Sequence, residues 1–387
     1  MNRWRIVHMT SVHVWHDTRV FSRMCRSLAR AGHDVHLVVP IADRSEVEVK
    51  EGVHLHPVPP PRGRLGRVWS TARDVVRVAQ SLQGDIYHFH DPELIPHAWW
   101  MAARGHCVIY DAHEDVPKDL IDKHWLKPPF GQLLSGPIDW TERWASRRFA
   151  AVVAAEEAIE QRFRGWARET LSIHNYPLLA DFPEPPADER EPREPWVVCF
   201  GGLSRLRAIE PLVDAVGLLP DARSARLILS GRCESEALME SLRAKPGFRR
   251  ADYRGWLSHA EMRQILQQAA VAIILFSPAP NNLQVRSNRF YESLACGIPV
   301  ITSNFPDWQA IVNELGCGLA VDPQNPAAIA EAIDHLLTHP EEAREMGRRG
   351  RAAIVDRLNW EREQQRLLEL YDRLMARRPA RVRGRRG

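Results

Sequence analysis

Short apolar runs alternate with helical segments along this chain, and the alternation occurs twice, once on each side of a proline-rich, charged stretch. That stretch spans residues 182–195 and contains five prolines, so it cannot form a helix interior or a central strand. Strands that alternate with helices form parallel sheets covered on both faces. We therefore predict an α/β chain with two doubly wound parallel-sheet domains.

The predicted first domain spans residues 1–181, the linker residues 182–195 and the second domain residues 196–359. Expected strands of the first domain lie at residues 6–9, 35–40, 53–56, 85–90, 107–111, 151–154 and 171–174. Those of the second lie at residues 196–200, 225–230, 251–254, 271–276, 299–303 and 318–321. A helix over residues 360–378 has an apolar face, and we expect it to pack back on the first domain. Ligands of such sheets bind beyond the carboxyl ends of the strands, here in a cleft between the domains.

Composition places the chain among globular proteins, because 44% of its residues are hydrophobic and 26% are charged. No apolar run approaches the roughly 18 residues that span a bilayer. The first residues lack the apolar core and cleavage site of a signal peptide, so we expect a protein kept in the cytoplasm. Six scattered cysteines without a C-x-x-C pair indicate reduced thiols.

The net charge of +3 is unevenly placed. Six arginines lie in the last eleven residues, so the rest of the chain carries about 3 − 6 = −3. We expect residues 379–387 to form a disordered basic tail. Contact with anionic lipid is one interpretation, a solvated tail is the simpler one, and we expect no nucleic-acid partner.

The segment 287–301 carries the most information about chemistry. Asn288 is a suitable N-cap, Gly297 can end the helix in a left-handed conformation, and Pro299 prevents its continuation. The N-terminus of such a helix can bind a phosphate. Glu292 lies in its early turns and can accept two hydrogen bonds from vicinal sugar hydroxyls. The alternative is that Glu292 only complements the helix dipole.

A second candidate segment follows the first strand of the second domain. Gly201 and Gly202 allow a ligand to approach the backbone, and Arg205 and Arg207 can neutralise a diphosphate. The segment contains neither G-x-G-x-x-G nor a P-loop signature. A simple loop is the alternative interpretation.

Polar residues also follow strands of the first domain. His88 and His90 end one strand and are candidate acid–base groups. A metal hydrolase is the rival hypothesis, because zinc or iron suits a set of histidines and carboxylates. That set comprises His88, His90, Asp91, His113, Glu114 and Asp115, whose spacing matches no metal signature.

The loop after the first strand contains no glycine. Asp17 is expected to cap the following helix, over residues 19–31, and Arg19 to reach an anion in the cleft.

These segments together resemble glycosyltransferase family 4 and its relatives, over nearly the whole chain and in the same order. The resemblance rests on residues 17–20, 32–35, 88–94, 110–115, 201–203 with 207, 255–256 and 288–299. It implies the GT-B fold, with two Rossmann-like domains, an acceptor site in the first and a donor site in the second. It also implies retaining transfer from a UDP- or GDP-linked sugar, with no bound metal and no further cofactor.

The resemblance also implies site residues. Expected catalytic residues are His90, Arg207 and Glu292. Expected donor-binding residues are Gly201, Gly202, Arg205, Arg207, Gly231, Trp256, Gln284, Ser287, Asn288, Arg289 and Glu292. Expected acceptor-side residues are Asp17, Arg19, His90, Asp91, His113 and Glu114.

The chain departs from the family at several positions. Many members have a glutamate eight residues before the one at position 292, where this chain has Gln284. An arginine often follows the first glycine of the second-domain turn, where this chain has Gly202, and the usual glycine-rich loop after the first strand is missing.

We predict a glycosyltransferase that moves a hexose-type sugar with retention to a saccharide or lipid-linked acceptor, in envelope, exopolysaccharide or lipopolysaccharide synthesis. The alternatives are a nucleotide-sugar epimerase of the same fold, the metal hydrolase, and a non-catalytic sugar-binding relative. Tryptophans and basic residues alternate in residues 120–149, which suits peripheral contact with an anionic membrane. A helical excursion whose tryptophans pack on the first domain is the simpler interpretation.

Overall fold

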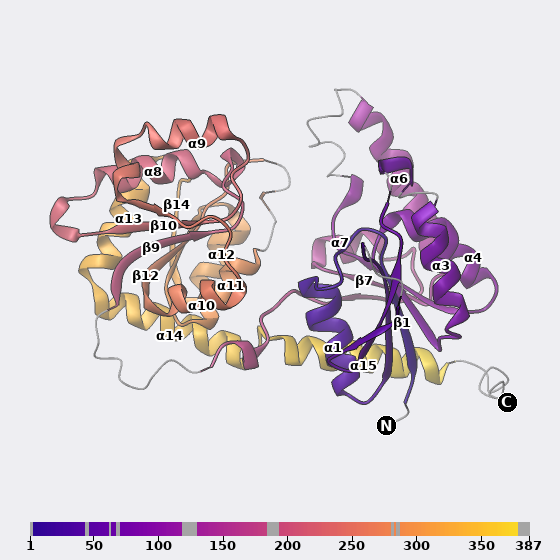
Figure 1. Ribbon diagram of the computed structural model, residues 1–387. Coiled ribbons are helices and arrows are strands. Elements are labelled where there is room, and N and C mark those ends of the chain that lie inside the picture. Colours follow the sequence, from indigo (N-terminus) through magenta and orange to yellow (C-terminus); the bar gives the residue numbers. More distant parts are fainter. Residues whose placement is uncertain are drawn as a thin grey trace. The chain divides into compact units, whose positions relative to one another are not determined.

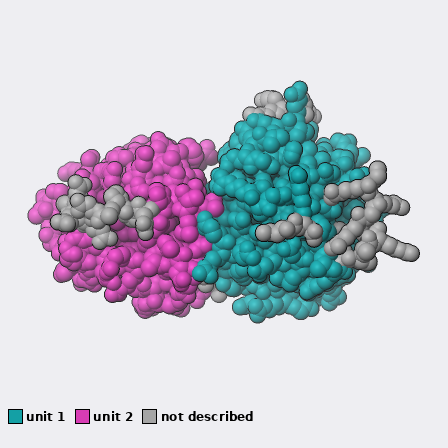
Figure 2. Space-filling view, turned by 90° about the horizontal axis from the view of Figure 1, so that it is seen from below, with its two compact units in different colours: residues 1–175, 360–387 teal, residues 176–359 magenta. Residues whose placement is uncertain are grey.

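The computed structural model describes residues 3–42, 46–61, 63–66, 70–117, 130–183, 193–279, 282–283 and 287–377. The chain divides into two compact units, coloured separately in Figure 2. Unit 1 comprises Met1–Asn175 and Trp360–Gly387, and unit 2 comprises Tyr176–Asn359. Each is a mainly parallel sheet with helices on both faces, which confirms the predicted fold class (Figure 1).

The sheet of unit 1 has the strand order β3-β4-β2-β1-β5-β6-β7-β8. Neighbouring strands are parallel except β3, which runs antiparallel to β4 and was not expected from the sequence. The strands are β1 (Arg5–Met9), β2 (Asp34–Pro40), β3 (Glu48–Lys50), β4 (Val53–Val58), β5 (Ile86–Phe89), β6 (Cys107–Ala112), β7 (Ala151–Ala154) and β8 (Thr170–Ser172). Its main helices are η1 (Thr18–Cys25), α1 (Arg26–Arg30), α3 (Ala72–Ser81), α4 (Ile95–Ala103), α6 (Phe130–Ser146), α7 (Glu157–Phe163) and α15 (Trp360–Ala376).

The last helix, α15, lies in unit 1, although about 185 residues separate its start from the end of the first segment of that unit. Trp360 is fully buried, and its Nε1 donates to Ser27 Oγ at 2.8 Å. Tyr371 is also fully buried, and its hydroxyl lies 2.6 Å from His88 Nδ1. The helix is therefore part of the core of this unit.

Unit 2 has an all-parallel sheet with the strand order β11-β10-β9-β12-β13-β14. The strands are β9 (Glu194–Phe200), β10 (Arg226–Ser230), β11 (Ala251–Tyr253), β12 (Ala269–Ile274), β13 (Val300–Ser303) and β14 (Gly318–Val321). Its main helices are α8 (Ile209–Leu218), α9 (Glu236–Arg243), α10 (His259–Gln268), α11 (Asn288–Ala295), α12 (Pro306–Leu315), α13 (Pro326–Thr338) and α14 (Pro340–Asp356).

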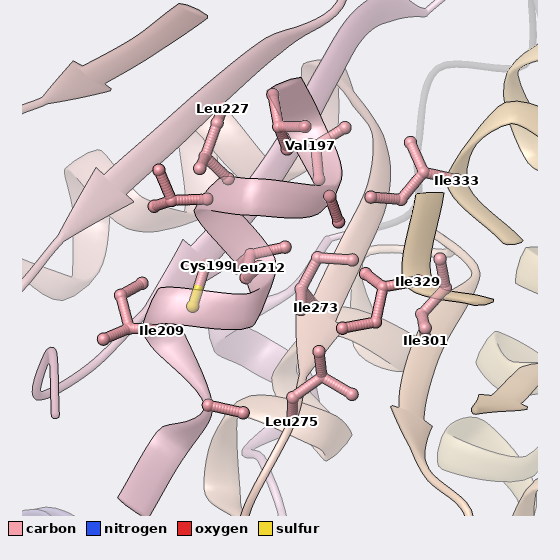
Figure 3. Close-up of a cluster of buried hydrophobic side chains, with 14 of the residues drawn as sticks. Val197, Cys199, Ile209, Leu212, Leu227, Ile273, Leu275, Ile301, Ile329 and Ile333 are labelled. Carbon is pink, nitrogen blue, oxygen red and sulfur yellow. The ribbon is translucent and has the colours of Figure 1, made fainter. Parts of the chain in front are cut away.

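The core of unit 2 on the α8 and α13 side is built from branched aliphatic residues. Figure 3 shows Ile209 and Leu212 of α8 beside Ile329 and Ile333 of α13, over strand residues such as Val197. Strands of parallel sheets are buried on both faces, which explains their near-continuous apolar runs. Among the helices in the described part of the chain, none is long and apolar enough to cross a membrane.

The boundary between the units differs from the expected one. The division falls between Asn175 and Tyr176, whereas the first domain was expected to extend to residue 181. Tyr176 packs edge-on against Tyr291 at 4.8 Å between ring centroids, and Phe182 is buried in the same cluster. These aromatic contacts draw the segment into unit 2. Residues 184–192 of the expected linker and the tail 379–387 lie outside the described residues.

The loops that follow β9 and β10 pack on each other backbone to backbone. Gly201 N donates to Ser230 O at 2.9 Å, and Gly231 N donates to Gly255 O at 2.7 Å. Gly231 has a φ of 135°, and a Cβ there would lie 1.8 Å from Gly201 O. Only glycine is compatible with this packing, which holds the carboxyl edge of the sheet together.

Replacement of Gly231 should therefore disrupt this edge. We expect Gly231→Ala to lower the free energy of unfolding by about 2–4 kcal/mol, because the methyl group meets backbone and the φ is strained. Gly202→Ala is the matched control, since its Cβ would meet nothing closer than Arg232 O at 4.0 Å. Thermal and urea unfolding measure both variants, and equal stabilities would contradict the proposed role of Gly231.

Candidate functional site

Arg207 is positioned by a tight turn at the carboxyl end of β9. The turn is a 3-10 helix over Arg205–Arg207, followed by Ala208 in a left-handed conformation with a φ of 48°. A Cβ on Gly201, whose φ is 115°, would lie 2.6 Å from Arg207 Nη1. A side chain at position 201 would displace the end of Arg207 and strain the backbone, so glycine leaves the arginine where it is. From the sequence, Gly201 was instead predicted to allow a ligand to approach the backbone.

The guanidinium of Arg207 has no anionic partner in the part of the chain that the structure describes. It lies 5.3 Å from the ring centroid of Phe276, and within the described ranges it makes no hydrogen bond or ion pair. Burial lowers the pKa of Arg207, and the neighbouring Arg289 lowers it further. A partly buried cation without a counter-charge is costly unless a ligand supplies one, so this position suits an anionic ligand.

Glu292 lies on α11, which begins at a different residue from the one expected. Ser287 rather than Asn288 is the N-cap, and its Oγ accepts from Arg289 N at 3.3 Å. Glu292 is 7% exposed and lies beyond the first turn, where the helix dipole has little effect. Its carboxylate pairs with the Arg289 guanidinium, and its Oε1 lies 4.0 Å from His259 Nδ1.

Arg289 connects the two candidate segments, which are about 80 residues apart in the sequence. It pairs with Glu292 and lies close enough to Arg207 to lower the pKa of that residue. The structure therefore places Arg207, Arg289 and Glu292 together, at the carboxyl ends of the strands of unit 2.

The other expected donor-binding residues have different surroundings. Arg205 is exposed and its Nε donates to Glu210 Oε2 at 3.0 Å, so it is already paired. Trp256, in the loop after β11, is 79% exposed. Gly202 is exposed, Gly231 holds the adjacent loops together, and Gln284 lies outside the described residues.

The sequence analysis missed the residues that support the Arg207 turn. Ser277 N donates to Leu206 O at 2.8 Å, and its Oγ donates to Arg205 O at 2.7 Å. Asn282 Nδ2 donates to Leu206 O at 3.2 Å. The only sequence signal was their place after an apolar strand, since the acceptors are backbone carbonyls 71–76 residues away.

In unit 1, Asp111 at the end of β6 is the centre of a buried polar network. Its Oδ2 accepts from Arg19 Nε at 3.0 Å, and its Oδ1 accepts from Arg19 Nη2 at 2.7 Å. Arg19 Nη1 donates to Ile173 O and Asn175 Oδ1. Arg19 is 3% exposed and fully engaged, so the expectation that it reaches an anion is wrong for this structure. Its side chain instead ties η1 to the strands.

The same network fixes the ring of His90. Its Nδ1 lies 3.0 Å from Asp111 Oδ2, and its Nε2 lies 2.9 Å from His8 Nδ1. Since a carboxylate accepts, we assign the proton to His90 Nδ1, and His8 then donates to Nε2. Burial lowers the pKa of His90, so the ring is neutral. Neither ring nitrogen is free to exchange a proton with a ligand, contrary to the expected acid–base role.

His113 approaches the same carboxylate, which creates a set of possible metal ligands. One ligand atom each of His90, Asp111 and His113 lies within 4.8 Å of the others. However, both Asp111 oxygens already accept from the Arg19 guanidinium, and a metal ion there would face a buried positive charge. These residues fit a hydrogen-bond network better than a metal site.

The remaining acceptor-side candidates surround His13, which the sequence analysis did not single out. Asp17 caps η1 as expected, with Oδ1 accepting from Arg19 N and Val20 N. His13 lies 3.5 Å from Asp17 and 3.4 Å from Asp91. Burial alone would lower the pKa of His13, but these two carboxylates raise it. Glu114 is exposed.

The buried histidines predict how stability depends on pH. Burial holds the pKa values of His8, His88 and His90 below the ordinary value. Below about pH 6.5 the unfolded chain binds protons that the folded chain cannot, so stability falls by about 1.4 kcal/mol per pH unit for each histidine. Unfolding midpoints between pH 8 and 5 measure this. His88→Gln should reduce the pH dependence of the free energy of unfolding by the contribution of one histidine. A stability that does not change with pH would contradict the prediction.

The Arg19–Asp111 pair predicts weak metal binding. A metal ion in excess that binds the native state would raise the unfolding midpoint. Since we expect little binding, zinc, manganese or EDTA should shift this midpoint by less than about 1 °C. Arg19→Met removes the guanidinium, and any metal-dependent shift should then grow. A large shift with the unaltered chain would favour the metal hydrolase.

Comparisons with known proteins agree with this architecture. Residues 18–175 match the family of glycosyl transferase 4-like domains, and residues 194–339 match glycosyl transferases group 1. Glycogen synthase of Mycobacterium tuberculosis is 22% identical over 372 residues, which are 87% of this chain and 85% of that protein. Alpha-maltose-1-phosphate synthase of Mycolicibacterium smegmatis is 23% identical, over 89% of this chain and 95% of that protein.

Solved structures show the same fold. Sucrose-phosphate synthase from Thermosynechococcus elongatus has a TM-score of 0.72 at 21% identity, over 97% of this chain and 100% of that one. Anabaena HepE in complex with UDP-glucose has a TM-score of 0.71 at 15% identity, over 96% and 100%. The two matched families, their order and the two parallel-sheet units together show that this chain is a glycosyltransferase of the family 4 type with the GT-B fold.

Proposed function

We propose that this glycosyltransferase moves a hexose-type sugar from a UDP- or GDP-linked donor to a saccharide or lipid-linked acceptor, with retention at the anomeric carbon. The observation that carries the proposal is the guanidinium of Arg207, which has no anionic partner among the described residues and lies near Arg289. A diphosphate offers the charge that this position lacks.

The names of relatives support a hexose. Glycogen synthase and D-rhamnosyltransferase WbpZ of Pseudomonas aeruginosa, which is 27% identical over 196 residues, are both named for a hexose or its polymer. HepE was solved with UDP and with UDP-glucose. The proposal also keeps the pathway expected from the sequence, which is the assembly of an envelope polysaccharide, exopolysaccharide or lipopolysaccharide.

Donor binding would rearrange the ion pair on α11. Glu292 is held by Arg289 in the ligand-free chain, while no carboxylate of the described residues pairs with Arg207. The ribose hydroxyls of a donor would donate to the Glu292 carboxylate, and the diphosphate would attract both arginines. The N-terminal N–H groups of α11 add a further favourable field for the phosphate. On donor binding, the Arg289–Glu292 ion pair would thus be replaced by contacts of these residues with the diphosphate and the ribose.

This arrangement favours cleavage of the sugar–phosphate bond. As the bond breaks, negative charge develops on the leaving diphosphate, and preorganised cations stabilise it most in a poorly solvated site. In a retaining front-face reaction the departing phosphate accepts the proton of the acceptor hydroxyl. We assign no proton transfer to the His90 ring, because its two nitrogens are held by His8 and Asp111. The ring only fixes the position of the backbone at this residue.

The acceptor is assigned to the polar residues of unit 1. The side chain of His13 is 26% exposed and is flanked by Asp17 and Asp91, whose carboxylates raise its pKa. Such a group can donate a hydrogen bond to an acceptor hydroxyl or phosphate. The proposal includes a cytoplasmic location and peripheral contact with the inner face of the membrane.

Arginine variants test the donor site. We expect Arg207→Ala to reduce kcat/KM by about 10²–10³, as for the loss of one charge-stabilising group. Glu292→Ala should mainly weaken donor binding. Arg205→Ala should change either value by less than about threefold, because Arg205 is paired with Glu210 on the surface. Donor consumption with and without acceptor measures all three.

Two readouts separate the alternatives. Thermal shifts with UDP, GDP and their sugars report donor binding directly. A product formed from donor alone by inversion within the sugar would identify an epimerase, and tight binding without turnover would identify a non-catalytic relative. Normal turnover in both Arg207→Ala and Glu292→Ala would refute the site.

A further inference from the structure

Helix α6 is fixed firmly to unit 1 by its charged side. Arg162 pairs with Asp139, Glu142 and Asp115, and Tyr110 of β6 donates to Glu142 at 2.9 Å. Asp139 and Glu142 are the only acids in the sequence of α6, and both are used in this inward network. The opposite side of the helix therefore carries no negative charge.

That opposite side presents large apolar residues to solvent. Leu133, Trp140 and Trp144 follow one another at intervals of seven and four residues and are 64%, 57% and 41% exposed. The simpler expectation, that the tryptophans of this segment pack on the first domain, holds for more than half of Trp144, which stacks on Trp99, but for less than half of Trp140, while Trp125 lies outside the described residues. Exposed apolar side chains grouped on one rigid face mark an interaction site.

Helix α4 continues this surface, since the two helices pack against each other. Trp144 stacks on Trp99 of α4 at 5.4 Å and on Trp140 at 6.1 Å between ring centroids. Trp100 of α4 is 46% exposed. The indoles thus form a connected row from one helix to the other.

Two arginines lie beside the indoles of α4, and a third, next to one of them in the sequence, lies beside Trp166. Arg148 lies 4.8 Å from the ring centroid of Trp99, Arg147 lies 4.4 Å from that of Trp166, and Arg104 lies over Trp100. All three are exposed, and in the part of the chain that the structure describes none of them pairs with a carboxylate. We call Leu133, Trp99, Trp100, Trp140, Trp144, Arg104, Arg147 and Arg148 the tryptophan–arginine face.

We propose that the tryptophan–arginine face docks on a bilayer that contains anionic lipids. This inference rests on the peripheral contact in the proposed function and assigns it to one surface. Indoles prefer the boundary between headgroups and acyl chains, and guanidiniums bind lipid phosphates while their stems lie along apolar surface. No acid on the outer side of α6 opposes the approach. A protein partner would instead be expected to supply carboxylates, and a neutral glycan would leave the three arginines unused.

The test is co-sedimentation of the full chain with vesicles of phosphatidylcholine alone or with 30 mol% phosphatidylglycerol. Each arginine near an anionic surface contributes about fivefold in partitioning, so Arg104→Gln/Arg147→Gln/Arg148→Gln should weaken binding roughly hundredfold. Trp140→Ser/Trp144→Ser should weaken it at least tenfold, because two indoles leave the interface. Binding should also decrease with salt.

Matched variants control for charge and for the tail. Arg243→Gln/Arg348→Gln/Arg357→Gln removes three exposed arginines of unit 2, and Leu218→Ser removes a side chain that is 60% exposed on α8. Neither should change vesicle binding. A chain ending at Arg377 should keep most of it. Circular dichroism and the thermal shift with UDP and GDP verify that all variants fold and bind nucleotide.

Vesicle binding by the variants decides whether the tryptophan–arginine face contacts a membrane. Selective loss of vesicle binding in both face variants, with the nucleotide shift intact, supports the proposal even if the donor assignment fails. No binding to anionic vesicles, equal binding by all variants, or loss on truncation alone would overturn it. Conversion of a dimer to a monomer by the tryptophan variant without any vesicle binding would assign the face to self-association instead.

Discussion

A partly buried cation, Arg207, which has no anionic partner among the described residues, is the constraint around which the carboxyl edge of unit 2 is built. Gly201 lacks the Cβ that would collide with Arg207, and the left-handed Ala208 turns the chain into α8 directly after it. Ser277 holds the backbone of the turn. Three local features thus maintain a charge that none of the described residues neutralises. Protein interiors avoid such charges unless function requires them.

In unit 1, by contrast, the buried charge of Asp111 is neutralised within the protein. Parallel strands deliver Asp111, His90 and His8 to neighbouring positions, and there every charge is matched, because Arg19 neutralises Asp111 and the histidines remain neutral. A largely hydrogen-bonded network of this kind favours one arrangement, although the buried His8 Nε2 has no hydrogen-bond partner among the described atoms. Its accessible ionisable group is His13, at the margin of the network, rather than His90 at its centre.

The two units therefore suit different parts of a group transfer. An unpaired cation is useful where negative charge develops, whereas a rigid neutral network is useful where a hydroxyl must be held. The tryptophan–arginine face adds a third element, which would bring the chain to a membrane that holds a lipid-linked acceptor. Among its described residues the chain has no membrane-spanning helix.

Periodicity and turn chemistry were readable without coordinates. The double alternation of strands and helices, the ending of α11 at Gly297 and the capping by Asp17 depend on neighbours within a few residues, and all three were predicted. The motifs around Arg207 and Glu292 were also found, since residue type and order along the chain suffice for that. The N-cap was misplaced by one residue, because Ser287 and Asn288 are equally good candidates by type.

Tertiary structure alone decided which charges are free. Arg19 and Arg207 both follow strand-end turns and look equivalent in sequence. Arg19 nevertheless meets a carboxylate from a strand 92 residues away, whereas Arg207 meets none among the described residues. Likewise, the exposure of Trp140 depends on which side of α6 Arg162 anchors. Pairing and burial arise from contacts between distant segments, and the local patterns in a single sequence do not specify those contacts.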